Sequence, residues 1–236
     1  MKDLFGQAIL DFQTNTSPKD IITETNISEA DEMDVAYLFR GFDDMPKLEQ
    51  KALQLAKGKI LDVGCGAGSH SLYLQEKGFD VTAIDISENA IKACQLRGLK
   101  NARVQNILDL DSDSPQNKFD TILLLMNGTG IFQTIAEISN YLQKLKSLLH
   151  PNGQILIDSS DIIYMYDENE DGSFLVPADS YYGELTFTIS YKNQSEDSFP
   201  WLYLDYNTLQ NAANANDFQS ELIEEGEHFD YLARLF

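Results

Sequence analysis

The sequence predicts an α/β fold in which a mainly parallel, doubly wound sheet is covered by helices on both faces. Three apolar runs, 60–63, 80–84 and 119–125, have the length and continuity of strands buried on both sides. A segment with helical spacing follows each run, and this alternation is typical of βαβ units. At 236 residues with 43% hydrophobic residues, the chain has the size of one such domain with appendages.

The stretch 60–68, ILDVGCGAG, is a strand that breaks into glycines just before a helical pattern. Such a turn delivers a ligand to a helix N-terminus, where backbone N–H groups favour an anion. A dinucleotide-binding turn requires a third glycine at position 69, whereas this chain has Ser69. The spacing therefore favours a cofactor without a pyrophosphate. The alternative is a tight turn that needs positive φ and binds nothing.

The second strand, 80–84, ends at Asp85, which lies 21 positions (85 − 64) beyond Gly64. At this distance an acidic residue reaches the ribose hydroxyls of an adenosine. An ionised carboxylate suits two vicinal hydroxyls because both donate and the carboxylate only accepts. The alternative is that Asp85 caps the following helix, although Ser87 already suits that position.

These motifs resemble those of the class I S-adenosylmethionine-dependent methyltransferases over roughly residues 57–158. The resemblance implies a Rossmann-like methyltransferase fold with seven strands and S-adenosyl-L-methionine as the cofactor. The cofactor-binding residues that it implies are Asp62, Gly64, Cys65, Gly66, Gly68, Asp85, Ile86, Asn106, Ile107, Met126 and Asn127. The segments 38–40, 45–49, 181–184, 201–203 and 230–235 are similar to a little-characterised bacterial branch, which fixes no substrate.

The resemblance also assigns the adenine contacts. Asn106 follows the third strand, 103–105, at the position where the family usually has an aspartate that binds the adenine amino group. An amide oxygen can accept the same hydrogen bond, and Asp109 is the alternative residue. Ile86 and Ile107 would enclose the adenine ring by apolar burial. Ordinary core packing explains either isoleucine equally well.

The fourth strand ends in the loop 126–130, MNGTG, at the carboxyl edge where open α/β sheets bind ligands. We expect this loop to face the transferable methyl group, with Asn127 as a positioning hydrogen-bond partner. Methyl transfer from a sulfonium depends mainly on alignment, which contributes ~7–11 kcal/mol. If the acceptor must lose a proton, the residues that could take it are Asp158, Tyr164, Asp161 and His150, and none stands out.

Four regions are predicted along the single domain: an N-terminal helical lid (1–56), a cofactor-binding core (57–158), a substrate-side insertion (159–206), and a final helix with a hairpin (207–236). In the first region, 29–39 and 46–56 read as helices, and 1–27 as a lid or a loosely ordered arm. Arg40 either pairs with the methionine carboxylate or is an ordinary surface arginine.

The later elements follow from periodicity and end signals. A helix is predicted over 134–149, with Thr134 and Glu137 as a capping box, followed by a fifth strand over 154–158. In the insertion, 183–191 and 199–204 read as an antiparallel pair. The aromatic residues that could line an acceptor pocket are Tyr164, Tyr166, Tyr181, Tyr182 and Trp201, with core packing or a dimer contact as the alternative for each.

The net charge of −21 makes nucleic-acid substrates improbable, because affinity for phosphates comes from clustered Lys and Arg. The acidity serves solubility or attracts a cationic acceptor. Cys65 and Cys94 lie in elements that no pattern brings together, and we expect reduced thiols, no metal site and a cytoplasmic location. We expect no membrane partner and a monomer or homodimer.

The function that these observations predict is transfer of a methyl group from S-adenosylmethionine to a small-molecule acceptor. Two alternatives remain at this stage. One is a sensor or partner protein that binds S-adenosylmethionine without catalysis. The other is an NAD-dependent oxidoreductase, which Ser69 disfavours.

Overall fold

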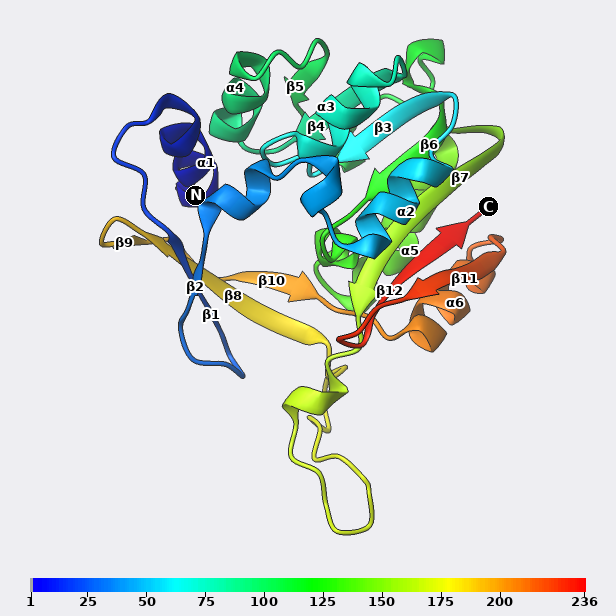
Figure 1. Ribbon diagram of the computed structural model, residues 1–236. Helices are drawn as coiled ribbons and strands as arrows, with labels where there is room; N and C mark the ends of the chain where they lie inside the picture. The colour runs from blue at the N-terminus through cyan, green and yellow to red at the C-terminus, as the bar shows by residue number, and fades with distance from the viewer. Residues whose placement is uncertain (1) are drawn as a thin grey trace.

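A computed structural model describes residues 2–236 and shows two sheets (Figure 1). The larger has seven strands in the order β11-β12-β7-β6-β3-β4-β5. Its strands are β3 (Lys59–Val63), β4 (Asp80–Asp85), β5 (Ala102–Val104), β6 (Phe119–Leu124), β7 (Leu149–Ser160), β11 (Ser220–Glu225) and β12 (Asp230–Leu235). Strands β3 to β7 pair in parallel, whereas β12 pairs antiparallel with β7 and β11. The predicted seven-stranded, mainly parallel sheet is confirmed.

Helices cover both faces of this sheet. The helices are α1 (Leu4–Thr14), α2 (Lys47–Leu55), α3 (Ser69–Glu76), α4 (Glu88–Leu96), α5 (Ile138–Leu148) and α6 (Tyr206–Ala215). Helices α5 and α6 pack on one face, and α2 and α3 on the other. Successive strand residues point to opposite faces, so Leu61 joins the α5 side while Ile60 joins the α2 side. This alternation explains why the strands are apolar throughout.

The smaller sheet has the order β10-β8-β1-β2, with β9 attached to β8. Its strands are β1 (Ile21–Thr25), β2 (Asp31–Met33), β8 (Glu184–Tyr191), β9 (Gln194–Ser195) and β10 (Phe199–Leu202). The predicted antiparallel pair of the insertion is therefore confirmed as β8 and β10. The sheet also contains two N-terminal strands that the sequence did not predict. Strand β1 pairs with β8 and β2 pairs with β1, so chain segments about 160 residues apart lie side by side.

The predicted helix over 29–39 is wrong. Residues Asp31–Met33 form β2, and only Val35–Phe39 is helical, as a short 3₁₀-helix. Strand β1 supplies backbone partners for β2, and this pairing overrides the helical spacing. The Asp34 side chain accepts the Ala36 N–H at 2.8 Å and starts the 3₁₀-helix.

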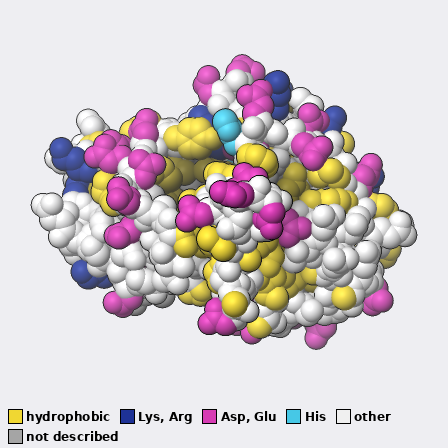
Figure 2. Space-filling model, turned by 90° about the horizontal axis from the view of Figure 1, so that it is seen from below, with side chains coloured by type: hydrophobic (Ala, Val, Ile, Leu, Met, Phe, Trp, Pro, Cys, Tyr) yellow, Lys and Arg dark blue, Asp and Glu magenta, His cyan; other side chains and the backbone are white. Residues whose placement is uncertain are grey.

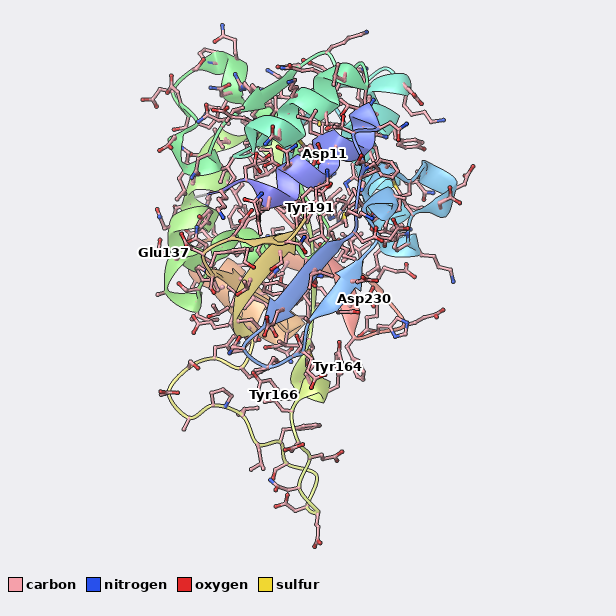
Figure 3. The ribbon with its side chains drawn as sticks, turned by 90° about the vertical axis from the view of Figure 1, so that its left-hand side faces the viewer. Asp11, Glu137, Tyr164, Tyr166, Tyr191 and Asp230 are labelled. Atoms are coloured by element: carbon pink, nitrogen blue, oxygen red, sulfur yellow. The ribbon has the colours of Figure 1, made fainter. Side chains whose placement is uncertain are left out.

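Residues 2–27 are not a loosely ordered arm, because they include α1 and β1. Helix α1 packs against α4, and the Asp3 carboxylate joins the two helices by accepting from Ser87 Oγ at 2.8 Å and Asn89 Nδ2 at 2.9 Å. At its other end, Asp11 accepts from the Tyr191 hydroxyl at 3.0 Å, which attaches α1 to β8 (Figure 3). The N-terminal region thus bridges both sheets.

The predicted helix over 134–149 is split into a 3₁₀ turn, Ile135–Glu137, followed by α5. The predicted capping box is wrong, since Thr134 makes no side-chain capping bond. The Glu184 carboxylate instead accepts the Ile135 N–H at 2.7 Å. A residue of β8, distant in the sequence, therefore caps this segment.

A long loop over 166–183 leaves the carboxyl end of β7 and projects away from both sheets (Figures 1 and 3). Tyr164 and Tyr166 lie at its root. Figure 2 views the molecule from the side on which this loop projects, and shows apolar side chains interspersed with Asp and Glu, with few Lys or Arg. Among residues 2–236, no helix has the length and apolarity needed to cross a membrane.

Candidate cofactor-binding and active site

The glycine turn links β3 to α3. Gly64, Gly66 and Gly68 have φ of 71°, 51° and 82°, a region that side chains disfavour. The N–H groups of Gly64 and Cys65 both bond to the Ile84 carbonyl, at 2.9 and 3.1 Å, which fixes the turn over β4. A Cβ added to Gly66 would meet open space, whereas one on Gly68 would lie 2.8 Å from Cys94 Sγ. The turn is therefore packed against Cys94 at Gly68 and open at Gly66.

Asp85 lies at the carboxyl end of β4, directly beside this turn. Its Oδ2 accepts the Gly66 N–H and its Oδ1 accepts the Ser87 N–H, each at 2.9 Å. Burial raises the pKa of Asp85, and the two backbone hydrogen bonds oppose that shift. Ser87 is the residue that caps α4, by accepting the Ala90 N–H at 2.9 Å. The carboxylate therefore holds the turn and retains lone pairs for further donors.

Asp62, another predicted cofactor contact, is fully buried beneath the turn. Its carboxylate accepts the Ser71 hydroxyl at 2.6 Å, and burial raises its pKa. Because this bond joins the end of β3 to α3, Asp62 supports the shape of the turn from inside.

The predicted adenine contacts lie at the ends of β4 and β5. Ile86 is 72% exposed, which is unusual for an isoleucine, whereas Ile107 is buried in the core. The Asn106 side chain accepts the Leu108 N–H at 2.9 Å and so starts a short 3₁₀-helix, Ile107–Asp109. The exposed side chain of Ile86 and the amide of Asn106 thus flank the position beside Asp85.

The loop after β6 is strained and firmly held. Met126 and Asn127 have φ of 67° and 59°, an uncommon conformation for residues other than glycine. Both oxygens of Asp158 hold the loop, since they accept the Met126 and Gly128 N–H groups at 3.0 Å each. Asn127 accepts the Ser160 hydroxyl at 3.0 Å. Burial raises the pKa of Asp158 to about 6, against the two hydrogen bonds.

A buried charge network, which the sequence did not indicate, lies on the other side of the turn. Arg40 pairs with Glu49, and Glu49 contacts His70 Nε2 at 2.6 Å. Burial opposes both charges, but the hydrogen bond between them lowers the pKa of Glu49 and raises that of His70. The only sequence signal was the position of His70, directly after Ser69 at the start of α3. The network joins α2 to α3 beside the turn.

Arg40 is not a surface residue, because its side chain is buried. The guanidinium stacks on Tyr37 at 3.9 Å from the ring centroid and donates to the Tyr37 carbonyl at 2.6 Å. Arg40 Nε, however, is buried and has no hydrogen-bond partner among the described residues. A donor without an acceptor in the interior is costly.

The aromatic residues of the insertion divide into two groups. Trp201 packs directly against Gly130 of the loop after β6, so closely that a Cβ on Gly130 would overlap the indole. Tyr181 and Tyr182 donate to Asp205 and Asp161, at 2.7 and 2.8 Å.

The other two aromatic residues lie at the root of the projecting loop. Tyr166 donates to the Tyr182 carbonyl at 2.7 Å, while Tyr164 is half-exposed and stacks on Phe229. Trp201 therefore contacts the loop after β6, whereas Tyr166, Tyr181 and Tyr182 contact one another.

His150 does not belong to this site. It lies near the start of β7, whereas Asp158 lies near the end, and it lines a hollow of about 760 Å³ together with Lys57 and Lys118, which precede β3 and β6. Since parallel strands share their direction, this hollow is at the amino edge of the sheet. The expectation that His150 could be a base is wrong. No group of three or more metal-ligating side chains occurs in residues 2–236.

The fold brings the two cysteines together, contrary to expectation. Their Sγ atoms are 4.0 Å apart, both are free thiols, and both are buried. Cys94 lies on the face of α4 that covers the glycine turn, and its thiol donates to the Gly66 carbonyl at 3.2 Å. The sequence indicated a helix that begins near Ser87, but it did not indicate which side of the glycine turn that helix covers.

Comparison with known proteins agrees with this geometry. A family model described as a methyltransferase domain matches residues 55–200. An S-adenosylmethionine-dependent methyltransferase from Bacteroides fragilis, solved in complex with S-adenosyl-L-homocysteine, is 45% identical, with a TM-score of 0.90 over all of this chain and 94% of that chain. The chain therefore belongs to the methyltransferase domain family. Within it, the chain is a class I S-adenosylmethionine-dependent methyltransferase, as the motifs indicated.

Curated relatives match over less than half of this chain. The putative methyltransferase YqeM of Bacillus subtilis is 33% identical over 107 residues, which are 43% of this chain and 42% of the relative. A ubiquinone biosynthesis O-methyltransferase of Xanthomonas euvesicatoria pv. vesicatoria is 30% identical over 112 residues, or 45% of each chain. The chain thus spans under half the length of these relatives.

Proposed function

We propose that this protein transfers the methyl group of S-adenosylmethionine to a small organic acceptor at the carboxyl edge of the larger sheet. The observation that carries the proposal is the arrangement of the glycine turn, Asp85 and the strained loop after β6, which meet at that edge. Ligands of open α/β sheets bind there because strand ends and helix N-termini converge.

The residues present fit the cofactor. Gly66 faces open space and Asp85 has lone pairs left for two ribose hydroxyls. Exposed Ile86 supplies apolar surface for a base. The unpartnered Arg40 Nε is a donor for a carboxylate, in support of the predicted pairing with the methionine moiety.

The bound cofactor supplies an activated methyl group, and the protein supplies alignment and a dry environment. Asp158 fixes the loop after β6 by its two backbone hydrogen bonds, so Asn127 is held where it can orient an acceptor. Because both Asp158 oxygens already accept hydrogen bonds inside the fold, we assign Asp158 a positioning role and not that of a base.

The acceptor side favours a ligand that donates hydrogen bonds. Tyr181 and Tyr182 give their hydroxyl protons to Asp205 and Asp161, and the Tyr181 oxygen also accepts the Asp205 N–H at 3.0 Å, so neither hydroxyl has a proton left to donate to a ligand. Burial raises the pKa of Tyr181 to about 12, which keeps it protonated. Residues 159–206 include ten Asp or Glu, one Lys and no Arg. This supports an amine or hydroxyl compound as the acceptor and disfavours nucleic acid.

Calorimetric titration with S-adenosylhomocysteine and, in parallel, NAD tests the cofactor. Binding of S-adenosylhomocysteine is expected, whereas NAD binding without it would overturn the proposal. A transfer assay with labelled methyl groups against amines, phenols and carboxylates then tests the acceptor class. We place the protein in the cytoplasm as a monomer or homodimer, in keeping with its two free thiols.

A further inference from the structure

Cys65 and Cys94 are the two cysteines of the chain, and they meet at the glycine turn. A disulfide has a sulfur separation of about 2.05 Å, so the present 4.0 Å is a contact between thiols that a movement of roughly 2 Å would convert into a bond.

The glycine turn is packed so closely around Cys94 that the two sulfurs cannot approach each other without a shift of the turn. Cys94 Sγ bonds to the Gly66 carbonyl at 3.2 Å and lies 2.8 Å from where a Cβ of Gly68 would be. Gly66 in turn donates its N–H to Asp85. Drawing the two sulfurs together therefore displaces the segment that carries both the open Gly66 position and the Asp85 hydrogen bond. A bond at this point reshapes the site in which the cofactor fits.

Access to the thiols depends on the turn. Both side chains are buried, and the contact with Cys94, together with burial, raises the pKa of the Cys65 thiol well above its usual value. Because the thiolate is the reactive species, the two thiols do not react with oxidants while the turn is closed. Reaction with an oxidant therefore requires the turn to open, and a ligand bound to the turn would oppose that opening.

We propose that Cys65 and Cys94 form a reversible disulfide when the cofactor-free protein meets hydrogen peroxide, and that this disulfide weakens cofactor binding. This inference rests on the proposed function of the turn. One thiolate attacks the peroxide, whose O–O bond breaks to leave a sulfenic acid and one water. The second thiol then attacks the sulfenic sulfur, the S–S bond forms and a second water leaves. Two thiols are oxidised, and one peroxide is reduced to two waters.

The test treats the whole protein with hydrogen peroxide, with and without saturating S-adenosylhomocysteine, and follows intact mass and free thiols. We expect the loss of two hydrogen atoms and of both thiols in the cofactor-free protein, with slower loss when S-adenosylhomocysteine is bound. The oxidised protein should bind S-adenosylhomocysteine about 5- to 150-fold more weakly, the usual range of coupling between sites. Dithiothreitol should restore binding.

The matched variants are Cys94→Ser and Cys94→Ala, each compared with itself before and after peroxide. Neither variant can form the disulfide, so peroxide should not change the affinity of either variant for S-adenosylhomocysteine. A wild-type protein that keeps both thiols, or that forms the disulfide and binds as before, contradicts the inference. Failure of the reduced protein to bind S-adenosylhomocysteine is a separate result that contradicts the proposed function, while disulfide formation remains measurable by mass.

Discussion

The carboxylate of Asp85 accepts the backbone N–H of Gly66 at 2.9 Å, and this bond ties the end of β4 to the glycine turn that follows β3. The second oxygen of the carboxylate holds the Ser87 N–H at the start of α4. One side chain therefore organises three elements around the cofactor position. The same residue is the one that the spacing from Gly64 predicted for the ribose.

Replacing Asp85 with alanine should weaken S-adenosylhomocysteine binding by roughly 10- to 150-fold, because hydrogen bonds to a charged acceptor contribute about 1.5–3 kcal/mol. Asp85→Asn should have a smaller effect, since it keeps one acceptor oxygen. Calorimetry measures both, and thermal unfolding checks that the fold is retained. Asp80→Asn, at the exposed start of the same strand, is the control. An unchanged Kd in Asp85→Ala would mean that another group holds the ribose.

Asp158→Asn should loosen the loop after β6, because an amide can accept only one of the Met126 and Gly128 hydrogen bonds. We expect lower turnover with a nearly unchanged Kd for S-adenosylhomocysteine, because the loop that carries Asn127 loses one of the two hydrogen bonds that hold it. The transfer assay and calorimetry measure these effects. Asp113→Asn, in an exposed loop, is the control. Full activity in Asp158→Asn would contradict the positioning role.

Comparison of the wild type with Asp158→Asn by urea unfolding also tests the pKa of Asp158. That pKa is raised from 3.8 to about 6 in the folded protein. Between these values the folded state binds more protons than the unfolded state, so this group contributes less stability as the pH rises. The wild type should therefore exceed Asp158→Asn in unfolding free energy by more at pH 5 than at pH 7. A constant difference would show that Asp158 titrates normally.

His70→Gln should destabilise the protein in a pH-dependent way. The folded pKa of His70 is raised above 6.5, so its contribution is complete below that value and is lost as the pH rises through the folded pKa. The gap in unfolding free energy between wild type and His70→Gln should thus narrow from pH 6 towards pH 9. Urea titrations measure it, with exposed His228→Gln as the matched control. A gap that widens with pH would mean that His70 is neutral beside Glu49.

Tyr182→Ala and Trp201→Ala should leave the S-adenosylhomocysteine affinity nearly intact and reduce turnover or acceptor affinity. Both side chains contact the carboxyl edge, Tyr182 through Asp161 and Trp201 through Gly130. Once an acceptor is found, steady-state kinetics separate KM from kcat. Tyr73→Phe, on α3 and stacked on Phe42, is the control. Unchanged kinetics in both alanine variants would place the acceptor under the N-terminal segment instead.

The sequence determined the core of the fold and the identity of the cofactor. Glycines at 64, 66 and 68, an acid after the second strand, and apolar runs buried on both faces are local requirements of a β-turn-α unit, so each is legible over a few residues. The register of that unit then places Asp85 beside Gly66, as the structure shows. Ser69 in place of a glycine was sufficient to distinguish this turn from that of a dinucleotide fold.

Only the tertiary structure decided the surroundings of that core. The strand at 31–33 exists because β1 pairs with it, and Glu184 caps Ile135 across 49 positions of sequence. The buried chain Arg40–Glu49–His70 and the contact of Cys65 with Cys94 likewise join elements that no local pattern relates. Local spacing encodes which residues share a face of one element. It does not encode which element that face will meet, because the pairing is fixed by the burial and hydrogen bonding of distant segments.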